Sequence, residues 1–168
     1  MITEKLISML ETQADELSAS WVTLLKDNEN TRSRLGFSDI ELTKYSLFLY
    51  EQLRLWLDWQ RTSAEVAKLF WEFGVDRKQQ NVELSEIHYG IILSRRNLYI
   101  NILEKMGEED VADMQELIAF TSRITYFFDK IGYFVIKGYE GLSAPTVSDE
   151  AALDGILDAF RSGSSPDM

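Results

Sequence analysis

The chain has 168 residues, of which 45% are hydrophobic and 27% charged, so it suits one globular domain and is not disordered as a whole. Its formal net charge of −11 lacks the basic footprint that nucleic acid requires and disfavours an anionic membrane surface. Because there is no cysteine, a disulfide framework, a thiolate nucleophile and Cys-based metal sites are all excluded.

Helices are expected along nearly the whole chain. The only prolines are Pro145 and Pro166, so no residue of 1–144 lacks the backbone N–H that a helix needs. Apolar residues at helical spacing predict a first helix over about residues 3–26, followed by a polar loop. The sequence therefore predicts an all-α domain.

Two capping boxes mark the starts of the next two helices. Ser38-Asp39-Ile40-Glu41 precedes a run of apolar residues at helical spacing, which predicts a helix over about 39–58. Thr62-Ser63-Ala64-Glu65 repeats the signal and predicts a shorter helix that ends near Arg77.

A fourth helix is predicted from Glu83 or Leu84 to Gly107, which is suited to a C-terminal stop. Apolar and mixed residues form two adjoining stripes on it. The first stripe carries Ile87, Ile91, Leu98 and Ile102, and the second carries His88, Ile92, Arg95, Tyr99 and Leu103.

The fifth predicted helix, from about Glu109 to Gly141, is the longest, and Gly132 lies in its middle. Its two apolar stripes together are wider than a single core contact requires, which is typical of a helix that faces both its own core and a second molecule. One stripe contains Val111, Met114, Ile118, Thr125, Phe128, Val135 and Tyr139, and the other contains Leu117, Phe120, Ile124, Phe127, Ile131 and Phe134.

After residue 142 the composition shifts to Ser, Ala, Pro and Asp, so we divide the chain into a domain over 1–142 and a linker or tail over 143–168. Apolar spacing within the tail allows a short amphipathic helix over 149–161. This segment either packs on its own domain or docks onto a partner.

Reactive side chains are scarce. There is one histidine and no Gly-rich phosphate loop, so we expect no catalytic residues, no metal site and no cofactor. His88 is either a packing residue or a single proximal ligand for haem iron. The opening residues lack the features of a signal peptide, and the apolar runs are too short to span a bilayer, so a cytoplasmic protein is expected.

Several sparse motifs resemble the RsbRD N-terminal domain family. Where that family has a glycine before its fourth helix, this chain has Asn81, which also tolerates a positive φ angle. The segments that carry the resemblance are Phe73-Gly74-Val75-Asp76-Arg77, Leu84-Ser85-Glu86-Ile87, Arg95-Arg96-Asn97-Leu98, Phe127-Phe128-Asp129-Lys130 and Lys137-Gly138-Tyr139-Glu140.

The resemblance implies a globin-like bundle of about five main helices without haem, whose last two helices are long and antiparallel. It also implies a sensory or regulatory role in bacterial signalling, as in stressosome proteins of the RsbR type, and dimerisation through those two helices. The residues expected at the dimer interface are Ile92, Arg95, Tyr99, Ile124, Phe128, Gly132 and Val135.

Our leading hypothesis is thus a haem-free, homodimeric sensor or regulatory domain, open to a small ligand or a signalling protein partner but not to nucleic acid or membrane. One alternative is a haem-binding sensor that uses His88. The other is a standalone adaptor that binds a protein partner through its acidic surface and residues 149–161.

Overall fold

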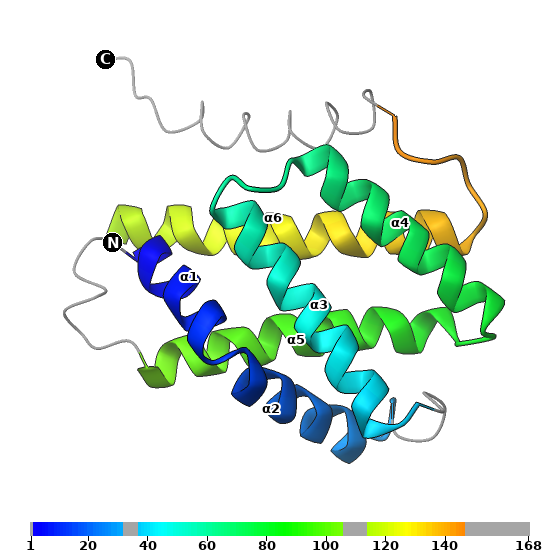
Figure 1. Cartoon of the computed structure of the whole chain (residues 1–168), viewed down its shortest axis with the longest axis horizontal. Helices are drawn as coiled ribbons and strands as arrows, with labels where there is room; N and C mark the ends of the chain where they lie inside the picture. Colours follow the sequence, from blue (N-terminus) through cyan, green and yellow to red (C-terminus); the bar gives the residue numbers. More distant parts are fainter. Residues whose placement is uncertain (1, 32–36, 106–113, 147–168) are drawn as a thin grey trace.

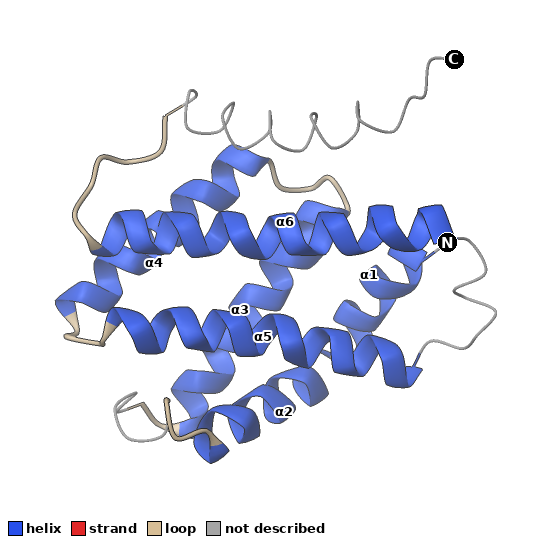
Figure 2. Cartoon of the chain, turned by 180° about the vertical axis from the view of Figure 1, so that it is seen from behind, coloured by secondary structure: helices blue, strands red, loops and turns tan. Residues whose placement is uncertain are grey.

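The computed structural model describes residues 2–31, 37–105 and 114–146, and within these ranges the chain is helical and contains no strand (Figures 1 and 2). The all-α prediction is confirmed. The described helices are α1 (Ile2–Thr12), α2 (Ala14–Asp27), α3 (Asp39–Leu57), α4 (Ser63–Gln79), α5 (Leu84–Lys105) and α6 (Met114–Tyr139).

The single first helix expected over 3–26 is wrong, because the chain breaks at Gln13 into α1 and α2. Gln13 has φ −126° and ψ 19°, outside the helical region. Both segments contact α3, but α1 also contacts α6, whereas α2 also contacts α5. Lys105 at the end of α5 contacts both sides of this break: it donates to the side chain of Gln13 and pairs with Glu16 at 3.0 Å. Tertiary packing therefore overrides a continuous helical pattern.

Both predicted capping boxes are present. At the start of α3, Ser38 Oγ accepts from the Glu41 backbone N–H at 3.3 Å, and Glu41 Oε2 accepts from the Ser38 backbone N–H at 2.8 Å. At the start of α4, Thr62 and Glu65 make the equivalent pair of bonds at 3.2 and 2.7 Å. The predicted starts of these two helices are thus confirmed by the atoms expected to make them.

Helices α4 and α6 cross with their backbones in direct contact. A Cβ atom built on Gly74 of α4 would lie 2.1 Å from the Val135 carbonyl oxygen, and one on Gly138 of α6 would lie 2.0 Å from the Trp71 carbonyl oxygen. Only glycine leaves room for this double approach. At Gly132, by contrast, a Cβ would meet the His88 imidazole at an ordinary 3.8 Å.

Helices α5 and α6 run antiparallel side by side, as expected, and both are seen along their length in Figure 2. Arg95 pairs with Asp129 at 3.2 Å, and the Tyr99 hydroxyl lies 3.1 Å from the Thr125 hydroxyl, so later residues of α5 meet earlier residues of α6. One predicted stripe of each helix faces the core, and Phe128 and Val135 of the other α6 stripe are buried as well. The buried residues of the two core-facing stripes are Ile87, Ile91, Leu98 and Ile102 on α5, and Phe120, Ile124, Phe127, Ile131 and Phe134 on α6.

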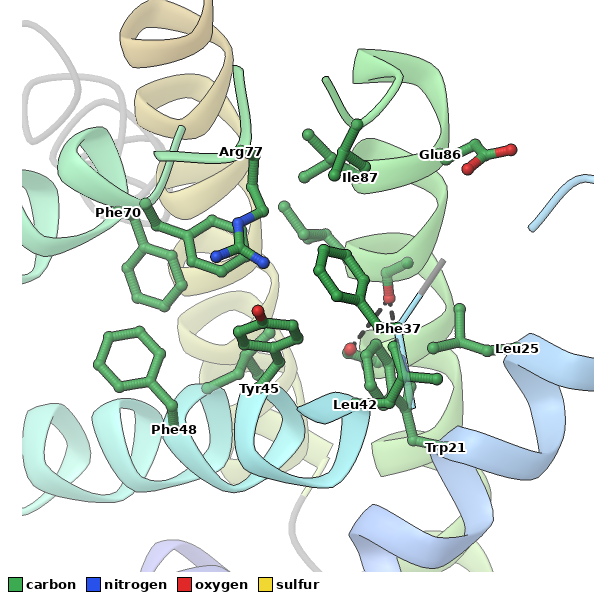
Figure 3. A pocket seen from close by; sticks show the side chains of 16 residues that line it. Trp21, Leu25, Phe37, Leu42, Tyr45, Phe48, Phe70, Arg77, Glu86 and Ile87 are labelled. Atoms are coloured by element: carbon green, nitrogen blue, oxygen red, sulfur yellow. Dashed lines mark hydrogen bonds between the residues drawn. The ribbon is translucent and has the colours of Figure 1, made fainter. Parts of the chain in front are cut away.

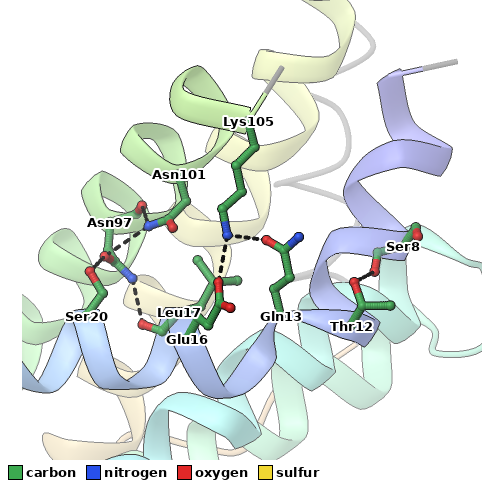
Figure 4. A network of polar contacts seen from close by, with 9 residues as sticks. All are labelled: Ser8, Thr12, Gln13, Glu16, Leu17, Ser20, Asn97, Asn101 and Lys105. Atoms are coloured by element: carbon green, nitrogen blue, oxygen red, sulfur yellow. Dashed lines mark hydrogen bonds and ion pairs between the residues drawn. The ribbon is translucent and has the colours of Figure 1, made fainter. Parts of the chain in front are cut away.

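A buried polar network ties α2 and α3 to α5, and Figure 4 shows the contacts between α2 and α5. Asn97 Nδ2 donates to the Leu17 carbonyl at 2.9 Å and to the Tyr50 hydroxyl at 3.0 Å, and Asn97 Oδ1 accepts from the Ser20 hydroxyl at 2.7 Å. The Tyr50 hydroxyl donates in turn to the Ser94 carbonyl at 3.0 Å. Burial raises the pKa of Tyr50, so this donor keeps its proton.

Helix α6 ends close to the predicted Gly141, which has a left-handed φ of 73°. The predicted stop at Gly107, the helix start at Glu109 and the amphipathic segment 149–161 lie outside the described residues. None of the helices described is both long and apolar enough to cross a bilayer.

Candidate functional site

A partly open cavity of about 60 Å³ lies between α2, α3, α4 and α5 (Figure 3). Its walls are mainly aromatic and aliphatic, with Trp21 from α2, Tyr45 from α3, Phe70 from α4 and Ile91 from α5. A space of this size holds a few waters or a very small organic molecule.

Arg77, in the last turn of α4, places a charge at the wall of this cavity. The residue is only 4% exposed, and its Nη2 donates to Asp76 at 2.6 Å. The guanidinium carbon lies 4.4 Å from the ring centre of Tyr45 and 4.9 Å from that of Phe73, in cation–π contact. Its Nε and Nη1 atoms are buried and have no hydrogen-bond partner among the described residues.

The role of Arg77 as a buried cation at the cavity wall was not predicted from the sequence. There Arg77 marked only the end of a helix and part of a sparse motif. Basic residues are common in the last turn of a helix, where they complement the helix dipole. The available signal was the proximity of Phe73 one turn earlier, but Tyr45 comes from a different helix and its approach could not be read from spacing.

Helix α5 separates the cavity from a shallow groove on the other side. Gly90 and Ser94 face the cavity, whereas His88 and Ile92 face the groove, and Ile91 lines both. Phe128 and Gly132 of α6 form part of the groove's lining. The groove has a volume of about 230 Å³.

His88 is exposed and does not line the cavity. Its imidazole lies beside Gly132, across α5 from the aromatic walls. The chain has one histidine, and it lies across α5 from the apolar cavity. A haem-binding sensor would need this histidine on the same side as the apolar space that holds the porphyrin.

The seven residues expected at a dimer interface divide into three groups. Four of them line the α5–α6 groove: Ile92 and Arg95 are at least partly exposed there, whereas Phe128, at 2% exposure, and Gly132 are buried in the single chain. Tyr99 lies farther along the same face of α5, partly exposed. Ile124 and Val135, with 0% and 1% exposure, are already packed inside the core of the single chain.

Comparisons with protein-family models, with curated proteins and with solved structures find no match. The resemblance noted in the sequence thus rests on the motif residues themselves, and the structure gives two of these and the substituted position Asn81 a physical role. Gly74 and Gly138 allow the α4–α6 crossing, and Asn81 adopts φ 56° in the turn before α5. Within the described ranges no cluster of three or more His, Asp or Glu side chains is placed to hold a metal ion.

Proposed function

We propose that the chain is a non-catalytic bacterial sensor or regulatory domain, globin-like and haem-free, that works as a homodimer through α5 and α6 and resembles the N-terminal sensor domain of RsbR-type stressosome proteins. The observation that carries the proposal is the position of α5. One side of this helix lines an apolar cavity and the other lines an exposed groove, and Ile91 contributes to both.

This arrangement couples a ligand to an interface. A molecule that fills the cavity contacts the packed side of α5. Close-packed helices respond to such a contact by small rigid-body shifts rather than by local deformation. A shift of α5 moves Ile92 and Arg95 at the groove. The ligand changes the association of two copies to the extent that it binds the two positions of α5 with different affinity.

The α5–α6 surface has the apolar character that an interface between two copies needs. Ile92 is 37% exposed at the groove, and Leu103 and Ile118, toward one end of the same helix pair, are 78% and 59% exposed. A two-fold interface places the same patch of each copy against the other, so a single continuous face is sufficient. Gly132 of α6 lines the same groove, next to the His88 imidazole.

The position of His88 favours the haem-free version of this function. A haem sensor would need the imidazole inside an apolar pocket, and His88 lies exposed on the groove side of α5.

The dimer is tested by two matched substitutions. Ile92→Glu puts a charge into the groove and should weaken self-association at least tenfold in sedimentation velocity, because an unpaired buried carboxylate is costly. Ile40→Glu makes the same change at a 69% exposed position in the first turn of α3 and should leave self-association unchanged. A monomeric unmodified protein at micromolar concentration, or equal association of both variants, would reject the dimer.

A further inference from the structure

Arg77 has unused hydrogen-bonding capacity inside an apolar cavity. A buried guanidinium is stable only when its charge and its N–H groups have partners. Asp76 satisfies Nη2 from the protein exterior, and the rings of Tyr45 and Phe73 stabilise the charge but accept nothing from Nε and Nη1. A small anion inside the cavity would give these two N–H groups of Arg77 an acceptor.

We propose that the cavity binds a short-chain monocarboxylate, in the size range from acetate to butyrate, whose carboxylate accepts hydrogen bonds from Arg77. The remaining Nε–H and Nη1–H groups supply the donors, and the alkyl part packs against apolar walls such as Phe70 and Ile87. This inference deepens the proposed function, on which it rests, by naming the class of signal.

Size and polarity select this class of ligand over other anions. A cavity of about 60 Å³ is too small for a long acyl chain, and its lining offers few donors besides Arg77. Phosphate needs many donors to replace its hydration, and the apolar walls do not provide them. Glu86, also at the cavity, turns its carboxylate away from Arg77 in Figure 3.

Access from solvent runs past the same residues. Tyr45, Phe48, Phe73 and Arg77 line both the cavity and a shallow hollow on the outer surface between α3 and α4. Glu72 and Asp76 also line this hollow, so an entering carboxylate passes acidic side chains as well as the guanidinium.

Calorimetric titration of the full chain with sodium propionate tests the proposal. We expect saturable binding with a dissociation constant roughly between micromolar and millimolar, as befits a ligand with few heavy atoms. Propanol, which has nearly the same shape without the charge, should bind at least tenfold more weakly, and inorganic phosphate should show no saturable binding. Failure of propionate to saturate, or equal binding of propanol, would overturn the proposal.

Two arginine variants locate the binding site. Arg77→Met removes the donors and should weaken propionate binding at least tenfold, whereas Arg96→Met, at an exposed position of α5, should bind like the unmodified chain. If Arg77→Met does not fold, the Nε–H resonance of Arg77 in the unmodified protein gives the answer, because bound propionate must shift it more than the other arginine Nε–H signals. Unchanged affinity in a folded Arg77→Met variant, or an unshifted Arg77 signal, would refute the assignment.

The outcome can be separated from that of the proposed function. Propionate binding is measured on the chain whatever its oligomeric state, and self-association is measured by sedimentation with and without propionate. Binding that leaves self-association unchanged would support the ligand site and reject the coupling of ligand to dimer. A dimer that binds no propionate would support the homodimer and reject the ligand site.

Discussion

Gly138 carries the tightest contact between α4 and α6. A Cβ atom there would lie 2.0 Å from the Trp71 carbonyl oxygen, a backbone atom that cannot rotate away. Gly138→Ala should therefore force the two helices apart and lower the free energy of unfolding by about 1–3 kcal/mol or more. Urea unfolding at equilibrium measures this change.

A matched glycine provides the control for Gly138. In Gly90→Ala the new Cβ would meet Trp21 and Leu25 side-chain atoms at 3.7 and 3.8 Å, which are ordinary contacts. Since alanine is about 1 kcal/mol better than glycine inside a helix, Gly90→Ala should be neutral or stabilising. Equal losses in the two variants would show that the close approach at Gly138 does not determine its residue type.

At the scale of single residues, the sequence predicted burial better than contacts. The apolar stripe with Ile124 and Phe134 is buried as its spacing indicated, because helical periodicity determines which side of a helix is apolar. The same periodicity says nothing about which helices meet. The sequence thus marks Gly132 as the mid-helix glycine. The roles of Gly138 and Arg77 depend on contacts with other helices: Gly138 meets α4, and Arg77 meets Tyr45 of α3.

At the scale of elements, the capping box of α4 makes stability depend on pH. The backbone N–H of Thr62, and then its hydroxyl, hold the pKa of Glu65 below its usual value of 4.5. The charged carboxylate is thus favoured in the folded state, so its contribution is complete above about pH 4.5 and is lost as the pH falls through the lowered pKa.

Glu65→Gln tests this linkage. The amide oxygen can still accept from Thr62, as in other capping boxes, but it does not titrate. We expect the unmodified chain to be more stable at pH 7 and the difference to shrink as the pH falls below about 4.5, as followed by thermal unfolding. A companion variant, Thr62→Ala, should cost about 1 kcal/mol at neutral pH through loss of the cap. Stability curves that stay parallel over this pH range would contradict the expected role of Glu65.

Element boundaries followed from the sequence where a local signal exists. The side chains of Ser38 and Thr62 bond their own helix starts, so the predicted starts of α3 and α4 agree with the structure. Gln13 has no such signal, since it is neither glycine nor proline and the apolar spacing continues through it. The break there lets α1 pack on α6 and α2 on α5 while both contact α3, and only the folded chain determines these partners.

At the scale of the whole molecule, net charge opposes the proposed association. Each chain carries a formal charge of −11, so bringing two copies together concentrates like charge around the α5–α6 groove. The Arg95–Asp129 pair at the groove is internal to one chain and leaves no excess positive charge to offset the repulsion.

Raising the salt concentration should therefore strengthen the dimer. The Debye length falls from about 30 Å at 0.01 M to about 8 Å at 0.15 M salt, so long-range repulsion is screened while apolar contacts are retained. We expect the dissociation constant from sedimentation to fall severalfold over this range, and Ile92→Glu to remain mainly monomeric throughout. Weakening of the dimer by salt would instead mean that ion pairs join the two copies, with Arg95 exchanging Asp129 for an acidic residue of the other copy.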